Sequence, residues 1–135
     1  MPIAKELQTP VVYARKERSI VMADTFQTTY SSNTVGSNKT LYVAKSHIQP
    51  EDRILIVDDF LAGGSTQEAM LRIISDAGAT PVGIAVLIEK VYDSGRKSLS
   101  GFDVPVHSLV RVASVQDQII TLVEEEGYKE DEILD

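Results

Sequence analysis

The chain has 135 residues, of which 43% are hydrophobic and 24% charged, a composition that predicts one soluble globular domain and excludes a collagen-like or wholly disordered chain. Cysteine is absent, which excludes a disulfide framework and a thiolate metal site and favours a cytoplasmic protein. The net charge of −7 argues against a surface that neutralises nucleic-acid phosphates. No apolar run is long enough to span a bilayer, so a membrane partner is not expected.

The negative charge is concentrated at the C-terminus. Residues 124–135 hold seven of the 20 acidic side chains and one lysine. The sequence therefore predicts a nearly neutral domain over residues 1–123 and an acidic tail over residues 124–135. We expect the tail to be the solvated end of a helix rather than an interaction segment.

The first third of the chain predicts short elements around a polar loop. Residues 3–7 are expected to end a helix before Thr9-Pro10, and residues 11–13 are expected to form a short strand. Residues 24–39 are rich in Thr, Ser and Asn, which predicts strand edges around a mobile loop, and residues 41–44 form the returning strand.

The middle of the chain predicts a strand–helix–strand unit. Residues 54–57 form a continuous β-branched run, which is typical of a strand buried on both faces of a parallel sheet. Ser65 is expected to cap a helix that ends at Gly78, and residues 82–88 form the next apolar strand, joined by a right-handed crossover.

The last part of the chain predicts one more strand and a helix. Residues 106–110 have the β-branched composition of a strand. Ser114 is expected to cap a helix that ends at Gly127, because apolar residues recur at helical spacing between them. Together the elements predict an α/β fold with an open, mostly parallel twisted sheet and flanking helices.

The segment ILIVDDFLAGGST, residues 54–66, carries the chemistry. Ligands in open α/β sheets collect at the carboxyl ends of strands, where Asp58 and Asp59 are expected. The small-residue loop before the helix is suited to a phosphate group, because its amides and the helix N-terminus present positive partial charge. Two carboxylates suit a vicinal diol, either directly or through Mg²⁺. The combination predicts a ribose 5-phosphate site.

A bland interpretation is that the two aspartates only end a strand and the glycines only form a turn into a capped helix. Each half of the segment by itself favours that interpretation, since short motif matches are common. Their fusion in one segment favours the binding site.

The same segment resembles the phosphoribosyl-diphosphate (PRPP) signature of type I phosphoribosyltransferases, and the whole chain is most similar to the xanthine phosphoribosyltransferases among them. Three further blocks support the resemblance: VVYARKERS (11–19), TFQTTYSSNT (25–34) and IEKVYDSGR (88–96). The similarity runs from about residue 3 to residue 123.

The resemblance implies a role for each matching residue. Asp58 and Asp59 hold the ribose hydroxyls and Mg²⁺, Lys90 contacts the purine, and Tyr92 lies against the base. Tyr30 belongs to the mobile loop that closes over the substrate and is grouped with the two aspartates as catalytic. The remaining PRPP-binding residues are those of the 5-phosphate loop and the basic pair that reaches the diphosphate: Ala62, Gly63, Gly64, Ser65, Thr66, Arg15 and Lys16. For Lys90 and Tyr92 the alternative is a solvated strand end with a half-buried aromatic ring.

The implied activity is transfer of ribose 5-phosphate from PRPP to a 6-oxopurine, with xanthine ahead of guanine and hypoxanthine, in purine salvage by a homodimer. The family's N-terminal strand, diphosphate loop and hood have no counterpart in the sequence, so we expect an incomplete phosphoribosyltransferase domain. Two alternatives stay open: a non-catalytic PRPP-binding regulatory domain of the purine-repressor type, and a truncated paralogue that dimerises with a full-length relative.

Overall fold

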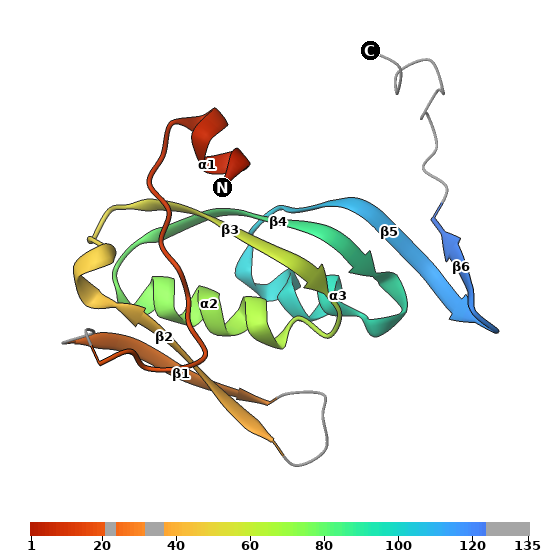
Figure 1. Cartoon of the computed structure of the whole chain (residues 1–135), viewed down its shortest axis with the longest axis horizontal. Helices are drawn as coiled ribbons and strands as arrows, with labels where there is room; N and C mark the ends of the chain where they lie inside the picture. The colour runs from red at the N-terminus through yellow and green to blue at the C-terminus, as the bar shows by residue number, and fades with distance from the viewer. Residues whose placement is uncertain (21–23, 32–36, 124–135) are drawn as a thin grey trace.

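A four-stranded sheet is the larger of two sheets in the computed structural model, which describes residues 1–20, 24–31 and 37–123 (Figure 1). Its strands are ordered β3-β4-β5-β6, and the first three are parallel while β6 is antiparallel to β5. The strands are β3 (Arg53–Leu61), β4 (Thr80–Lys90), β5 (Val106–Gln116) and β6 (Ile119–Leu122). The expected open, mostly parallel α/β sheet is confirmed.

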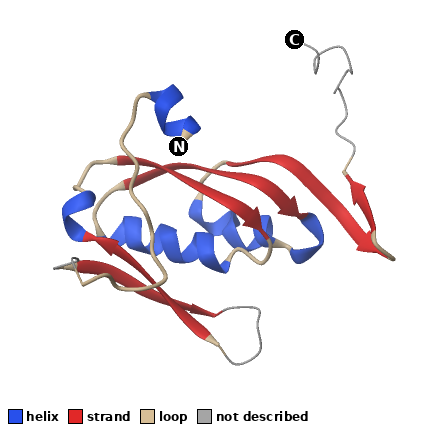
Figure 2. Ribbon diagram, in the orientation of Figure 1, coloured by secondary structure: helices blue, strands red, loops and turns tan. Residues whose placement is uncertain are grey.

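Helices α2 (Ser65–Asp76) and α3 (Gly95–Leu99) cover one face of this sheet (Figure 2). Short 3₁₀ turns follow β2, β4 and α3 and are formed by Lys45–His47 (η1), Val91–Asp93 (η2) and Ser100–Phe102 (η3). None of the helices in the described part of the chain is long and apolar enough to cross a membrane.

Helix α2 separates two hydrophobic cores. Its sheet-facing side packs with Ile56, Ile84 and Val86, and Leu99 of α3 joins the same cluster. Its other side packs on the antiparallel hairpin of β1 (Thr25–Ser31) and β2 (Asn38–Ala44), so the hairpin forms a third layer (Figure 1). The predicted strands on either side of the polar loop are confirmed, and the tip of that loop, residues 32–36, lies outside the described residues.

The N-terminal segment is only partly as expected. Helix α1 (Pro2–Leu7) confirms the predicted helix. The predicted strand at residues 11–13 is wrong: these residues are exposed, and the segment pairs only through one bridge, in which Arg15 and Tyr42 exchange two 2.8 Å backbone hydrogen bonds. A strand needs a neighbour along its length, and within the described residues none lies beside residues 11–13.

The predicted helix from Ser114 is also wrong. Strand β5 continues through Ser114 to Gln116, and the chain reverses at Asp117 and Gln118, whose φ values are 50° and 64°. Two consecutive residues in the left-handed region form the tight turn that best matches the twist of a hairpin, so the β-branched residues that follow pair as β6. Gly127 and the predicted tail lie outside the described residues.

Candidate functional site

The two aspartates lie near the carboxyl end of β3, which extends four residues beyond the predicted run and ends at Leu61. Asp58 is half-buried and Asp59 is exposed. The adjacent loop leads straight into α2, so carboxylates and loop meet at one edge of the sheet, as predicted.

Gly64, rather than the predicted Ser65, caps α2. Gly64 has a φ of 86°, a conformation that glycine adopts without steric cost, and Ser65 is the first helical residue. The first helical hydrogen bond runs from the Glu68 amide to the Gly64 carbonyl at 2.9 Å. The N–H groups of Ser65, Thr66 and Gln67 therefore stay outside the helical ladder, which leaves donors at the positive end of the helix.

The carboxylate of Asp58 is held by neutral donors. Gln67 Nε2 donates to Oδ2 at 2.9 Å, and the Asp59 amide donates to Oδ1 at 2.9 Å. Burial raises the pKa of Asp58 to about 6, and the Asp59 carboxylate adds to the rise, whereas the Asp59 amide and the Lys16 charge oppose it. The surroundings of Asp58 therefore disfavour its charged form.

Sequence reasoning missed Gln67. Its side chain is 2% exposed, and the same Nε2 also donates to the Phe60 carbonyl at 2.9 Å. A buried amide in the first turn of α2 therefore fastens the helix to the end of β3. The only sequence signal was a polar residue on the otherwise apolar inner face of α2.

Lys90 ends β4, the strand that pairs with β3 and its two aspartates. Its Nζ lies 5.5 Å from the ring centroid of Phe60, which follows Asp59 in β3 and is 48% exposed. Tyr92 lies in η2, two residues beyond Lys90, and is also 48% exposed. The structure therefore places Lys90 over Phe60, the residue after Asp59, and adds Phe60 as an exposed aromatic side chain that the sequence did not single out.

The loop of residues 91–95 packs directly on residues 62–66, the predicted phosphate-binding loop, which is called the phosphate loop below. A Cβ added to Gly95 would overlap the carbonyl oxygen of Ala62 and lie 2.7 Å from Leu61 Cδ1. A Cβ on Gly64 would lie 3.2 Å from the Gly95 carbonyl oxygen. Only glycine at position 95 allows the two loops to approach this closely.

Of the other predicted site residues, some act on the aspartates and some lie elsewhere in the structure. Lys16 is close enough to lower the pKa of Asp58, so its charge acts on the site. Arg15 instead places its guanidinium 5.9 Å from the Tyr13 ring centroid. The placement of Tyr30 in a mobile loop is wrong: it lies in β1, is 6% exposed and packs in the core beneath α2, because its side chain falls on the inward face of the hairpin.

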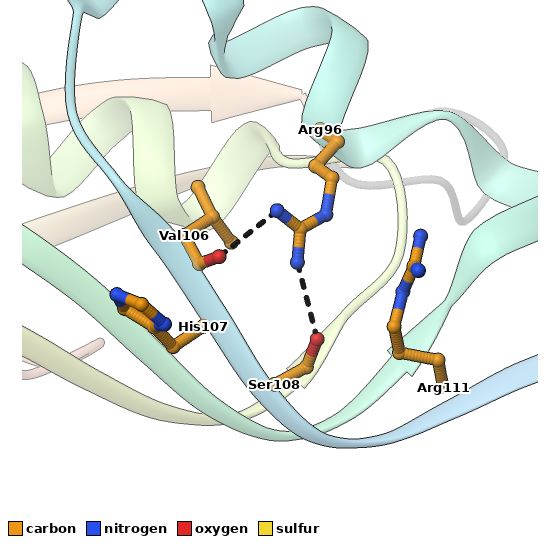
Figure 3. A pocket seen from close by; sticks show the side chains of 5 residues that line it. All are labelled: Arg96, Val106, His107, Ser108 and Arg111. Atoms are coloured by element: carbon orange, nitrogen blue, oxygen red, sulfur yellow. Dashed lines mark hydrogen bonds between the residues drawn. The ribbon is translucent and has the colours of Figure 1, made fainter. Parts of the chain in front are cut away.

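A second cluster of charges lies behind the end of β4 and was also missed. Glu89 is 3% exposed and accepts hydrogen bonds from Arg96 Nε at 3.0 and 3.1 Å, from Arg96 Nη2 at 2.9 Å and from Ser108 Oγ at 2.6 Å. Arg111 Nε lies 3.5 Å from Glu89 Oε1. Figure 3 shows Arg96 reaching across from α3 to Ser108 and the Val106 carbonyl, which it contacts at 3.3 and 2.9 Å.

These groups border an open pocket of about 330 Å³ lined by Arg96, Val106, His107, Ser108 and Arg111 (Figure 3). Burial acts to raise the pKa of Glu89, but hydrogen bonds from Arg96 and Ser108 and the two positive charges outweigh it, so the pKa is lowered. Glu89 therefore stays ionised as the centre of an internal ion-pair network. The sequence signal was an acidic residue inside an apolar strand.

The carboxylate oxygens of Asp58 and Asp59 suit a metal ion that is also coordinated by a bound substrate. No group of three metal-ligating side chains occurs within residues 1–20, 24–31 and 37–123. Asp58 and the exposed Asp59 offer hard carboxylate oxygens, which Mg²⁺ prefers, and Mg²⁺ is commonly held by one or two carboxylates together with substrate oxygens and water.

Comparison with known proteins agrees with the fold. The family model described as phosphoribosyl transferase domain matches residues 1–124. The chain is 40% identical over 121 residues to a xanthine phosphoribosyltransferase of Listeria monocytogenes, covering 89% of this chain and 63% of the relative. It is 38% identical over 119 residues to one of Pseudomonas fluorescens, covering 87% and 63%. The chain thus spans about 63% of the length of these relatives.

Solved structures agree as well. Adenine phosphoribosyltransferase from Thermoanaerobacter pseudethanolicus superposes with a TM-score of 0.73 at 29% identity, covering 82% of this chain and 61% of that one. The enzyme from Giardia lamblia, complexed with 9-deazaadenine, superposes with a TM-score of 0.74 at 26% identity, with the same coverage. The resemblance found in the sequence is confirmed, and the chain belongs to the phosphoribosyl transferase domain family.

Proposed function

We propose that this chain binds PRPP with Mg²⁺ and transfers its ribose 5-phosphate to a 6-oxopurine, with xanthine as the preferred base. The observation that carries the proposal is the junction of β3 and α2. There, two carboxylates lie beside a glycine loop whose helix leaves three N–H groups outside its own hydrogen-bond ladder.

Each half of the junction matches one part of a ribose 5-phosphate. The N–H groups at the start of α2 face the 5-phosphate, and the helix dipole favours its negative charge. Asp58 and Asp59 accept hydrogen bonds from the ribose hydroxyls, as only ionised carboxylates can do with both oxygens. Mg²⁺ bound with PRPP supplies charge neutralisation at the diphosphate, and Asp58 and Asp59 would hold it, directly or through water.

The purine is assigned to the end of β4. The Lys90 ammonium donates hydrogen bonds to exocyclic oxygens of a 6-oxopurine, and the exposed rings of Tyr92 and Phe60 offer stacking surfaces. The choice of xanthine rests on the identity of about 40% with the xanthine phosphoribosyltransferases.

The reaction breaks the bond between ribose C1 and diphosphate and forms a bond from C1 to a purine nitrogen, which loses its proton. The transition state carries positive charge on the ribose and negative charge on the leaving diphosphate. Preorganised charges and exclusion of water are then the main contributions of the protein. We assign Lys16, with Arg15, to the diphosphate, and we expect a homodimer.

The test is to mix the full chain with PRPP, Mg²⁺ and each of xanthine, guanine, hypoxanthine and adenine, and to follow nucleotide formation. We expect the fastest formation with xanthine. Measurable PRPP binding without product from any base would contradict the enzyme and support the PRPP-binding regulatory alternative.

A further inference from the structure

The ion pair between Glu89 and Arg96, called the clasp below, closes the segment that carries Lys90 and Tyr92 into a loop. It leaves β4 at Lys90, turns through η2 and Ser94, which has a φ of 60°, and enters α3. At its far end Arg96 turns back and binds Glu89, the residue before Lys90, through both Nε and Nη2. A planar guanidinium that engages a carboxylate with two nitrogens fixes orientation as well as distance.

Further hydrogen bonds to β5 hold both partners of the clasp in place. Glu89 is 3% exposed and is also held by Ser108 of β5, while Arg96 donates to the Val106 carbonyl of the same strand. The clasp thus joins β4, β5 and α3 on the side away from Lys90, whose ammonium lies over Phe60. Among the described residues, the Arg96–Glu89 pair is the one ion pair that spans the loop, because Arg111 approaches Glu89 from β5 rather than from the loop.

The top of the same loop rests on the phosphate loop. Gly95 lies so close to the Ala62 carbonyl that a single added carbon would overlap it, and Gly64 faces the Gly95 carbonyl. The loop that presents the purine contacts is therefore fixed at one end by Arg96 and supported along its backbone by the residues assigned to the 5-phosphate.

We propose that Arg96 is a positioning residue for purine recognition, because its bond to Glu89 holds the 91–95 loop against the phosphate loop in the geometry that Lys90 and Tyr92 need. This inference rests on the proposed function. Removing the two-nitrogen contact of Arg96 lowers the affinity for ligands that contact the 91–95 loop and does not change the affinity for PRPP. A larger side chain at Gly95 disturbs both loops.

The test compares two ligands by calorimetry with the full chain. In the proposed site, PRPP with Mg²⁺ contacts the phosphate loop and the aspartates but not the purine contacts, whereas xanthosine monophosphate contacts both. Both are binding measurements, and neither requires turnover. We expect Arg96→Lys, which keeps the charge but loses the two-nitrogen contact, to raise the Kd of xanthosine monophosphate at least 10-fold and the Kd of PRPP less than 2-fold. Lys97→Gln, on the exposed side of the same short helix, is the matched control and should change neither Kd.

Gly95→Ala provides a second arm, and we expect it to raise both Kd values at least 10-fold. Thermal melting of each variant verifies folding. The inference is overturned if Arg96→Lys raises the two Kd values in the same proportion, since that is a general structural effect, or if it leaves the Kd of xanthosine monophosphate within 2-fold. If the wild-type chain binds both ligands without forming nucleotide from PRPP and xanthine, the proposed function fails while the clasp is still tested.

Discussion

Asp58 and Glu89 lie near the carboxyl ends of two neighbouring strands, yet their surroundings are opposite. Glu89 is 3% exposed and is met by two guanidinium groups, which lower its pKa. Asp58 is half-buried and is met by two neutral donors and a second carboxylate, and its pKa rises to about 6. Burial opposes both charges, but the cations outweigh it at Glu89, whereas the charge of Lys16 does not outweigh it at Asp58.

This difference separates a structural carboxylate from a binding carboxylate. A buried acid with its cations in place contributes to the packing of the strands and helix around it. An acid that lacks such compensation is stabilised by what binds to it, which at Asp58 is a diol and a divalent cation in our proposal. Substitutions at the two sites should therefore have opposite effects on stability and binding.

The largest effect is expected at Glu89. Glu89→Leu leaves the charges of Arg96 and Arg111 without their carboxylate, so the free energy of unfolding should fall by about 3 kcal/mol, as is typical when one partner of a buried ion pair is removed. Urea unfolding measures this change. The control is Glu68→Leu, which breaks the exposed 3.2 Å pair with Arg72 and should cost less than about 1 kcal/mol. Equal losses at the two positions would contradict the buried network.

The next effect is on binding rather than stability. Asp58→Asn combined with Asp59→Asn removes both acceptors for the ribose hydroxyls, so the Kd of PRPP should rise by a factor of about 100 or more, the loss of two charge-assisted hydrogen bonds. Calorimetry with PRPP and Mg²⁺ measures it. Asp76→Asn at the other end of α2 should leave the Kd unchanged. An unaltered Kd in the double variant would refute the diol assignment.

Gln67 should have a smaller effect on the same ligand. Gln67→Leu removes the donor to Asp58 Oδ2, and the carboxylate then loses both its orientation and part of its stabilisation. We expect the Kd of PRPP to rise about 10-fold, the cost of one hydrogen bond to a charged group. If affinity is retained while the melting temperature falls, Gln67 only fastens α2 to β3.

The smallest effect is on the free energy of unfolding, through the unfavourable ionisation of Asp58 in the folded protein. An acid whose pKa is raised by folding is unfavourable to stability above that pKa, and the penalty disappears as pH falls below its ordinary value of 3.8. Asp58→Asn should therefore raise the free energy of unfolding at pH 7.5 by about 1 kcal/mol, a value reduced by solvent screening of this half-buried group. The gain should shrink below pH 6 and vanish near pH 4. Urea unfolding of both proteins at pH 7.5 and pH 4 measures it, and a variant less stable than wild type at pH 7.5 would contradict the unfavourable setting of Asp58.

The parts of the fold that the sequence predicts correctly are those with a single physical solution. The run at residues 54–57 is too apolar for an exposed element, and the helix that follows it has an apolar face ended by Gly78, which has a φ of 73°. Apolar residues at 115, 119, 120 and 123 fit a helical face, so the sequence predicts a helix where the structure forms the β5–β6 hairpin. The deciding feature, the positive φ at Asp117 and Gln118, has no strong signature in those residue types.

The site divides in the same way. Asp58, Asp59 and the phosphate loop are contiguous in sequence, so their grouping could be predicted. Gln67 and the partners of Glu89 depend on contacts between elements: Gln67 reaches Asp58 from α2, and Ser108 reaches Glu89 across 19 residues of chain. Tyr30 was assigned by its position in a motif, whereas the alternation of β1 turns its side chain into the core.

The most direct measurement is an NMR titration of the side-chain carboxyl carbons of Asp58 and Glu89 in one sample, with and without PRPP and Mg²⁺. The predicted result is a pKa of about 6 for Asp58 and a pKa below 4.5 for Glu89, with ligand shifting the Asp58 signal and leaving the Glu89 titration unchanged. An Asp58 pKa near 3.8, or a ligand response confined to Glu89, would contradict the distinction between the two strand ends.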